Sequence, residues 1–265
     1  MGGAVARASQ TAVSTDRGVS ETVSFVLVFA LVTASVGVVY TTGVSELRSV
    51  RNAERVENAQ RAFDVLADNL RDVIGGAPSR GTEIKLASAT LRSADDASMN
   101  VTVDPGGDGG APPVSWQYAL SPIVYDAATG GDIRLSNGAV IRDSERGSAA
   151  VLRAPPFVVD DDRVRLALIK QEHVGPAAVG GSQTVRVRMA AGRARLFYDD
   201  ASVVHDVRVN VTTPYTDAWA RYYESAGFDC SETDAPDGAA PGTISCSTTA
   251  ERVSVVWVRV RTSFE

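Results

Sequence analysis

The sequence predicts a long N-terminal α-helix, first transmembrane and then amphipathic, followed by an all-β head that is antiparallel and sandwich-like and contains one short helix. An uncharged apolar run, an apolar stripe at helical spacing and a series of short alternating segments are the observations behind this fold class. The predicted organisation is a leader at residues 1–18, the helix at residues 19–76 and the head at residues 77–265.

The apolar run from Val23 to Tyr40 contains no charged residue and indicates a membrane span. At 1.5 Å per residue, such a helix with its apolar flank is long enough to cross about 30 Å of hydrocarbon. A buried core helix and a cleavable secretory signal are the alternatives. We favour a retained span, because a soluble helix normally keeps one polar side and the run is longer than the apolar core of most signal peptides.

The segment after the span carries one apolar stripe whose members are spaced 3, 4, 3, 4 and 3 residues apart. The stripe consists of Val56, Ala59, Phe63, Leu66, Leu70 and Val73. Gly75 and Gly76 stop the pattern, and between Val23 and Ile74 the helix-weakening residues are the single glycines Gly37 and Gly43, with no proline. The span and the stripe are therefore predicted to form one helix of about 50 residues.

Alternating apolar and polar residues predict strands throughout the head. The clearest are 84–86, 99–103, 163–169, 184–189, 194–198, 207–212 and 253–261. One helix is predicted between Thr213 and Gly227, with Thr213 or Asp217 as its cap. Its aromatic face of Trp219, Tyr222 and Tyr223 is interpreted as packing against a sheet, in preference to a sugar-stacking platform.

Two kinds of site in the head indicate an oxidising compartment outside the cell. Cys230 and Cys246 bracket a loop rich in Gly, Pro and Asp, and we predict that they form a disulfide, with two free thiols as the alternative. Asn100 and Asn210 each begin an N-x-T sequence and are candidate glycosylation sites. The count of arginines on either side of the span does not favour a cytoplasmic N-terminus, so the outward orientation of the head rests on these sites.

Charge and motif content exclude several classes of function. The chain has 32 acidic and 26 basic residues and a net charge of -6, with Lys only at Lys85 and Lys170. No basic run is present, so no nucleic-acid partner is predicted. An Asp-rich, Lys-poor composition is typical of a halophilic source, and a GC-rich genome would produce much the same balance.

No catalytic, cofactor or metal site is predicted, and we do not expect an enzyme. His173 and His205 stand outside any catalytic or zinc-binding motif. The aspartates at 160–162 and at 199–200 lack the spacing of a calcium loop and are interpreted as hydrated turns. A surface enzyme remains the least supported alternative.

The residues before the span carry a family resemblance. Arg17 and Gly18 precede Val19 in an order that resembles the class III signal peptide of archaeal type IV pilins and archaellins, in which a prepilin peptidase would cut between Gly18 and Val19. The phrases SETVSFVLVFALVTASVGVVY, ERVENAQRAFDVLADNL and APSRGTEIKLASATL are similar to an uncharacterised family of haloarchaeal pilin-like or archaellin-like surface proteins. The resemblance is strongest over residues 17–91.

The resemblance implies a single-pass protein of the cell membrane with an extracellular head and helix–helix contacts with pilin-like subunits. Glu21 departs from the bacterial pattern, because it would be the third residue of the processed chain, whereas bacterial pilins have a glutamate at the fifth. Glu21 could pair with the N-terminal amine of a neighbouring subunit, although a place in the headgroup layer is favoured. The alternative is a permanent anchor that carries an adhesion or ligand-binding head, which would also be non-enzymatic.

Overall fold

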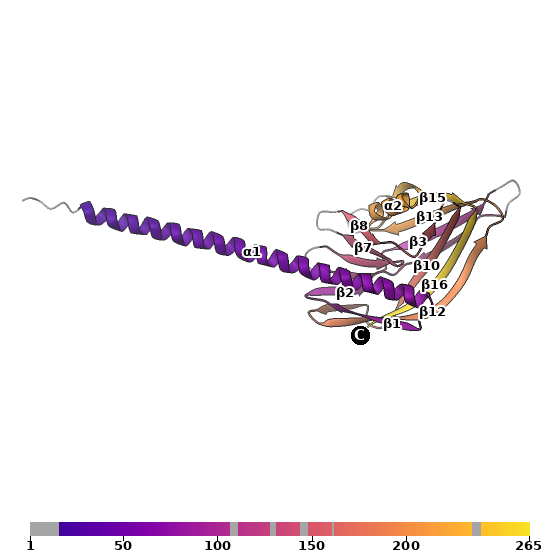
Figure 1. Cartoon of the computed structure of the whole chain (residues 1–265), viewed down its shortest axis with the longest axis horizontal. Coiled ribbons are helices and arrows are strands. Elements are labelled where there is room, and N and C mark those ends of the chain that lie inside the picture. The colour runs from indigo at the N-terminus through magenta and orange to yellow at the C-terminus, as the bar shows by residue number, and fades with distance from the viewer. Residues whose placement is uncertain (1–15, 107–110, 128–130, 144–147, 161, 235–239) are drawn as a thin grey trace, which may run out of the picture. The chain divides into compact units, whose positions relative to one another are not determined.

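A computed structural model describes residues 16–106, 111–127, 131–143, 148–160, 162–234 and 240–265 (Figure 1). The chain divides into two compact units, Met1–Arg51 and Asn52–Glu265, which we call the N-terminal unit and the head unit. The described part of the N-terminal unit is helical from Asp16 onward, and the head unit holds the strands and a second helix.

Helix α1 comprises Asp16–Ile74, so it begins three residues before the predicted helix and ends two residues short of its predicted end. Its C-terminus is closed by a Schellman motif, in which the Ala77 amide donates to the Asp72 carbonyl and the Gly76 amide donates to the Val73 carbonyl. Gly76 has φ +113°, a conformation that costs glycine little and other residues much more. Gly76, one of the two glycines that predicted the end of the helix, therefore also forms part of its C-terminal cap.

The strands among the described residues of the head unit form three sheets. Sheet A has the order β1 (Ser79–Lys85), β12 (Thr184–Asp200), β16 (Arg252–Phe264), β10 (Arg163–His173) and β9 (Val158–Val159). Sheet B has the order β11 (Ala178–Gly181), β2 (Ala89–Ser93), β5 (Ile123–Asp126), β6 (Ile133–Ser136), β7 (Ala139–Asp143) and β8 (Ala149–Arg153). Sheet C has the order β14 (Asp229–Asp234), β15 (Gly242–Ala250), β13 (His205–Thr213), β3 (Ser98–Pro105) and β4 (Val114–Ala119).

The described residues of the head unit form two hydrophobic cores, and sheet A contributes to both. In the first core, the buried stripe of α1 packs against one face of sheet A and against sheet B. In the second core, sheet C and helix α2 (Thr216–Ser225) pack with the other face of β10 and β16. The long strands β12 and β16 run past the elements of the first core and those of the second core (Figure 1). Successive side chains along a strand alternate between the two faces, which lets one sheet serve two cores.

The predicted fold class is confirmed, with an N-terminal apolar helix, a head composed mostly of antiparallel strands and one further helix. One pair of strands, β10 and β16, is parallel. The predicted strands at 184–189 and 194–198 are two parts of β12, which continues through a bulge between Ala191 and Ala194. The short strands β5 to β7 of sheet B were not predicted, because their runs are mostly buried and lack clear alternation.

Helix α2 is shorter than predicted, and its cap differs. Tyr215 occupies the N-cap position without a side-chain hydrogen bond, so the prediction of Thr213 or Asp217 as the cap is wrong. The Thr213 hydroxyl instead accepts a hydrogen bond from the Tyr215 amide at 3.3 Å, and Asp217 lies in the first turn. An acidic side chain there still interacts favourably with the helix dipole.

Candidate functional site

The apolar segment of α1 is the first candidate site. Thr22–Val44 is long and apolar enough to cross a membrane, and none of its most apolar window is buried in the structure. Its hydroxyl groups are satisfied within the helix: Thr33 donates to the Phe29 carbonyl at 2.8 Å and Thr41 donates to the Gly37 carbonyl at 3.0 Å. Such internal hydrogen bonds let hydroxyl side chains enter an apolar environment.

The predicted processing residues Arg17, Gly18 and Val19 lie in the first turn of α1, and Glu21 follows one turn later. The side chains of residues 16–21 lie outside the described part of the structure, as does the chain before Asp16. The roles predicted for these four residues therefore remain predictions.

The two cysteines form the predicted disulfide. Cys230 on β14 and Cys246 on β15 are directly opposite in the antiparallel ladder, with their Cα atoms 4.1 Å apart. The bridge joins the edge strand of sheet C to its neighbour. The loop between the two cysteines is described only in part, because residues 235–239 lie outside the described residues.

The two candidate glycosylation sites meet in the fold. Asn100 on β3 and Asn210 on β13 are direct cross-strand partners in sheet C, so their side chains are neighbours on one face. Both are half-buried, and their Oδ1 atoms have no hydrogen-bond partner in the described structure. Their use remains a prediction, but the sequence did not indicate that the two asparagines would be adjacent.

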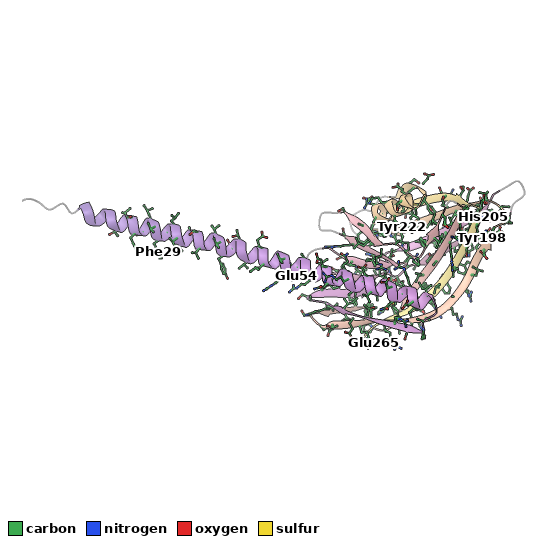
Figure 2. The ribbon with its side chains drawn as sticks, in the orientation of Figure 1. Phe29, Glu54, Tyr198, His205, Tyr222 and Glu265 are labelled. Atoms are coloured by element: carbon green, nitrogen blue, oxygen red, sulfur yellow. A yellow bond between two sulfur atoms is a disulfide. The ribbon has the colours of Figure 1, made fainter. Side chains whose placement is uncertain are left out.

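The histidines occupy structural positions. His205 is 0% exposed, and its Nε2 lies 3.1 Å from Asp200 Oδ2, with Tyr198 packed edge-on against the imidazole (Figure 2). His173 Nε2 lies 2.7 Å from the Pro176 carbonyl oxygen. No group of three or more His, Cys, Asp or Glu side chains in the described residues is placed to hold a metal ion.

The aspartate pairs have local partners. Asp200 accepts hydrogen bonds from the Ser202 side chain and amide, and these bonds are the main reason that its pKa lies below the usual value. Asp160 pairs with Arg163 at 2.6 Å, and Asp161 lies outside the described residues. Asp160 and Asp162 lie between β9 and β10, in line with the turn interpretation of that segment. Asp199 and Asp200 are the last residues of β12 and pair with Ser254 and Val253 of β16, so the turn interpretation of that pair is wrong.

The aromatic face of α2 packs inside the second core, as predicted. Trp219 and Tyr223 are fully buried, and Tyr222 is half-buried beside them. Burial raises the pKa of Tyr222 to about 12 and that of Tyr223 well above its usual value. The face is therefore closed to a sugar ring.

Basic side chains gather on the face of sheet A that is turned away from α1. On the opposite face of β12, Val185, Val187 and Met189 are buried in the first core, so the alternate positions point outward. By strand register this outer surface, which we call the basic face, has seven basic and three acidic side chains. They are Lys85, Lys170, Arg186, Arg188, Arg195, Arg259 and Arg261, with Glu83, Glu172 and Glu265.

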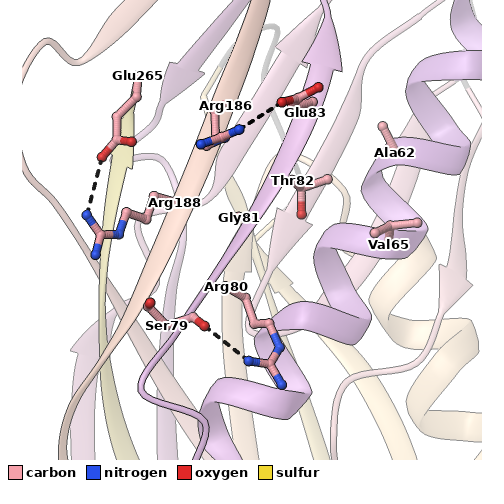
Figure 3. Close-up of a pocket in the computed structure, with 10 residues that line it drawn as sticks. All are labelled: Ala62, Val65, Ser79, Arg80, Gly81, Thr82, Glu83, Arg186, Arg188 and Glu265. Atoms are coloured by element: carbon pink, nitrogen blue, oxygen red, sulfur yellow. Dashed lines mark hydrogen bonds and ion pairs between the residues drawn. The ribbon is translucent and has the colours of Figure 1, made fainter.

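Three of the arginines on the basic face are paired. Arg186 lies 2.9 Å from Glu83, Arg188 lies 3.8 Å from Glu265, and Arg259 lies 3.4 Å from Glu172. The first two pairs flank a hollow of about 630 Å³ beside β1 (Figure 3). Strand β1 lies between α1 and β12, the strand that carries both arginines. The other four basic side chains form no ion pair with any described residue.

A stack of aromatic rings lies where the basic face ends. A second bulge, between Leu196 and Tyr198, brings Phe197 and Tyr198 to Trp116 of β4. Phe197 stacks with Trp116 and with Trp257, whose ring centroids are 5.6 and 6.1 Å away. All four rings are half-buried.

Residues 17–263 match a family model described as a family of unknown function (DUF7289). The chain belongs to this family. The chain matches no curated protein and no solved structure. The DUF7289 match extends over the apolar segment, the stripe and nearly all of the head, and it begins at Arg17.

The basic face of this DUF7289 protein was not predicted from the sequence, because the chain contains no run of basic residues. A signal was nevertheless present in the alternation of the strands. Segments such as TVRVRM and VWVRVR place arginine at every second position. Alternate positions share one face of a strand, so each strand indicated a basic side. Which strands would pair could not be read from these segments.

Proposed function

We propose that the protein is a membrane-anchored, pilin-like or archaellin-like surface subunit whose head faces outward. The observation that carries the proposal is that two segments of α1 differ in burial. Thr22–Val44 is apolar and unburied, whereas the stripe from Val56 to Val73 is buried in the first core of the head unit. A subunit of this kind needs an apolar helix for the membrane or for neighbouring helices, and a head that folds around its own part of the helix.

Two further observations support the proposal. The Cys230–Cys246 disulfide fits an oxidising compartment outside the cytoplasm. The family match begins at Arg17, beside the proposed cleavage point between Gly18 and Val19, so residues before it lie outside the region shared with the family. A leader removed by a prepilin peptidase would have this position.

The proposal is tested by the mature N-terminus of the protein from native membranes and by the fate of a processing variant. We expect chains that begin at Val19, and we expect Gly18→Leu to retain residues 1–18 and to be absent from filaments. Gly3→Leu is the matched control, because it makes the same substitution inside the leader and should process normally. Filaments built from unprocessed Gly18→Leu chains would contradict the proposal.

A permanent single-pass anchor with an adhesion or ligand-binding head is the second candidate. One observation favours it: α1 begins at Asp16, so Arg17 and Gly18 lie within its first helical turn. Mature chains that begin at or near Met1 would establish this candidate and exclude the pilin-like one. Neither candidate assigns an enzymatic activity to the head.

A further inference from the structure

We propose that the basic face of sheet A binds an acidic polysaccharide, that is, an extended sugar polymer bearing carboxylate or sulfate groups. The chain as a whole has a net charge of -6, yet this face gathers seven basic side chains against three acidic ones. A surface that opposes the sign of the whole protein attracts ligands of the other charge.

The register of the strands places like charges beside each other. Lys170 on β10 lies directly opposite Arg259 on β16. Like charges at cross-strand positions are destabilising, and Glu172 neutralises only part of this pair. A cost to stability that local contacts do not remove is typical of a binding surface.

The guanidinium groups are accessible. The side chains of Arg186 and Arg188 are 57% and 55% exposed. The strand positions on either side of Arg188 are occupied by small residues, Gly81 on β1 and Ser263 on β16. Arg188 borders both the hollow of about 630 Å³ and a second one of about 230 Å³, which Arg261 also lines. Small neighbours leave room for an anionic group, which a guanidinium can bind through two parallel hydrogen bonds.

The spacing of the face fits a polymer better than a single small anion. Side chains two residues apart on a strand lie about 7 Å apart, and neighbouring strands lie about 4.8 Å apart. The unpaired cations Lys170, Arg195 and Arg261 come from all three long strands of sheet A. Several anionic groups along one chain would therefore be bound at once, which raises affinity beyond that of each contact.

The aromatic stack argues against a single-stranded nucleic acid. Proteins that bind such strands offer aromatic faces on which bases stack. Phe197 stacks with both Trp116 and Trp257, whose planes lie within 17° of its own, and Tyr198 meets Trp116 edge-on, so these half-buried rings already pack against one another. The choice of a polysaccharide also rests on the outward-facing head proposed above, whereas the binding assay below does not depend on orientation or on leader cleavage.

The test is calorimetric titration of the full-length protein in an uncharged detergent with polygalacturonate, at low and high salt. We expect binding that weakens as salt rises, and no binding of neutral dextran. The double variant Arg195→Gln/Arg261→Gln should raise the Kd at least about 10-fold, because it removes two unpaired cations and breaks no ion pair among the described residues.

Arg208→Gln is the matched control, because Arg208 is an exposed arginine at an alternate strand position on β13 of sheet C. It should leave the Kd unchanged, and circular dichroism should show that all variants are folded. Failure to bind polygalacturonate, or equal effects of the double variant and the control, would overturn the proposal. If poly-dT binds more tightly than polygalacturonate and the double variant loses this binding, the basic face is a nucleic-acid site and the proposal is overturned. If the protein self-associates and the double variant does not, the face is instead a contact between copies of the chain.

Discussion

Gly192 illustrates how a single residue can set the course of a strand. It lies in the bulge of β12, where two residues of this strand stand opposite one residue of β16, between the positions that pair with Val260 and Val258. A Cβ atom at Gly192 would lie 2.4 Å from the carbonyl oxygen of Arg259. Backbone, unlike a flexible side chain, cannot move aside without disturbing the sheet. The close approach therefore requires glycine, and the bulge turns Arg195 onto the basic face.

We expect Gly192→Ala to lower the free energy of unfolding by about 1–3 kcal/mol, the range typical of overpacking. Urea unfolding of the full-length protein measures the change. Gly81→Ala is the control, because its added Cβ would meet only the flexible Arg186 side chain at 3.3 Å. Equal stability of the two variants would show that β12 and β16 separate easily at the bulge.

Helix α2 and its aromatic cluster behave as one element of the second core. Tyr222 packs edge-on against Trp219 and Tyr223, and Tyr223 in turn packs against Phe228 at a centroid distance of 5.1 Å. Desolvation disfavours the charged phenolate, which is why the pKa of Tyr222 rises to about 12. The element is thus stable while its phenols are neutral.

This burial predicts a loss of stability in alkali. An unfolded tyrosine has a pKa of about 10, so the unfolded chain releases the Tyr222 proton first, and the free energy of unfolding falls as pH rises from about 10 toward 12. Tyr222→Phe removes this titration, and we expect a shallower fall between about pH 10 and pH 12 in urea unfolding. Tyr40→Phe, at an exposed position of the apolar segment, should keep the wild-type slope. An unchanged slope in Tyr222→Phe would contradict the pKa assignment.

At the scale of the whole head unit, the second half of α1 connects sheets A and B. Its stripe is joined by polar contacts on both sides: Asn69 donates to the Thr82 hydroxyl of sheet A at 2.8 Å, and Arg142 of sheet B donates to Gln60 at 2.9 Å. Phe63 lies at the centre of the first core, edge-on to Tyr125 of β5. The strands of the head therefore fold around a helix that precedes all of them in the chain.

Phe63→Ala should lower the free energy of unfolding of the head by about 3–5 kcal/mol, because the side chain is 0% exposed and its removal leaves a cavity between two sheets. Val65→Ala is the matched control two positions away, where the side chain is 50% exposed and little should change. Thermal unfolding followed by near-ultraviolet circular dichroism distinguishes them. Similar losses in both variants would mean that the helix contributes through its length and not through this stripe.

The local patterns of the sequence predicted the elements of the fold but not their partners. Every member of the predicted stripe, from Val56 to Val73, is buried in the first core. The predicted strands lie within the observed ones, apart from Leu86 just beyond β1. Strands β5 to β7 of sheet B escaped prediction, because mostly buried strands such as β6 lack the alternation that marks a half-exposed strand. The basic face escaped because charge was judged along the chain and not across paired strands.

The sequence by itself determined the apolar segment, the buried stripe of α1, the alternating strands and, through its two cysteines, the disulfide. These features depend on residue type and on periods of two to four residues, which are local properties of the chain. Only the tertiary structure decided that β10 and β16 run parallel, that Asn100 and Asn210 become neighbours, and that arginines from separate strands share one face. Strand pairing joins residues far apart in sequence, and its register is set by packing across the sheets, which no local pattern contains.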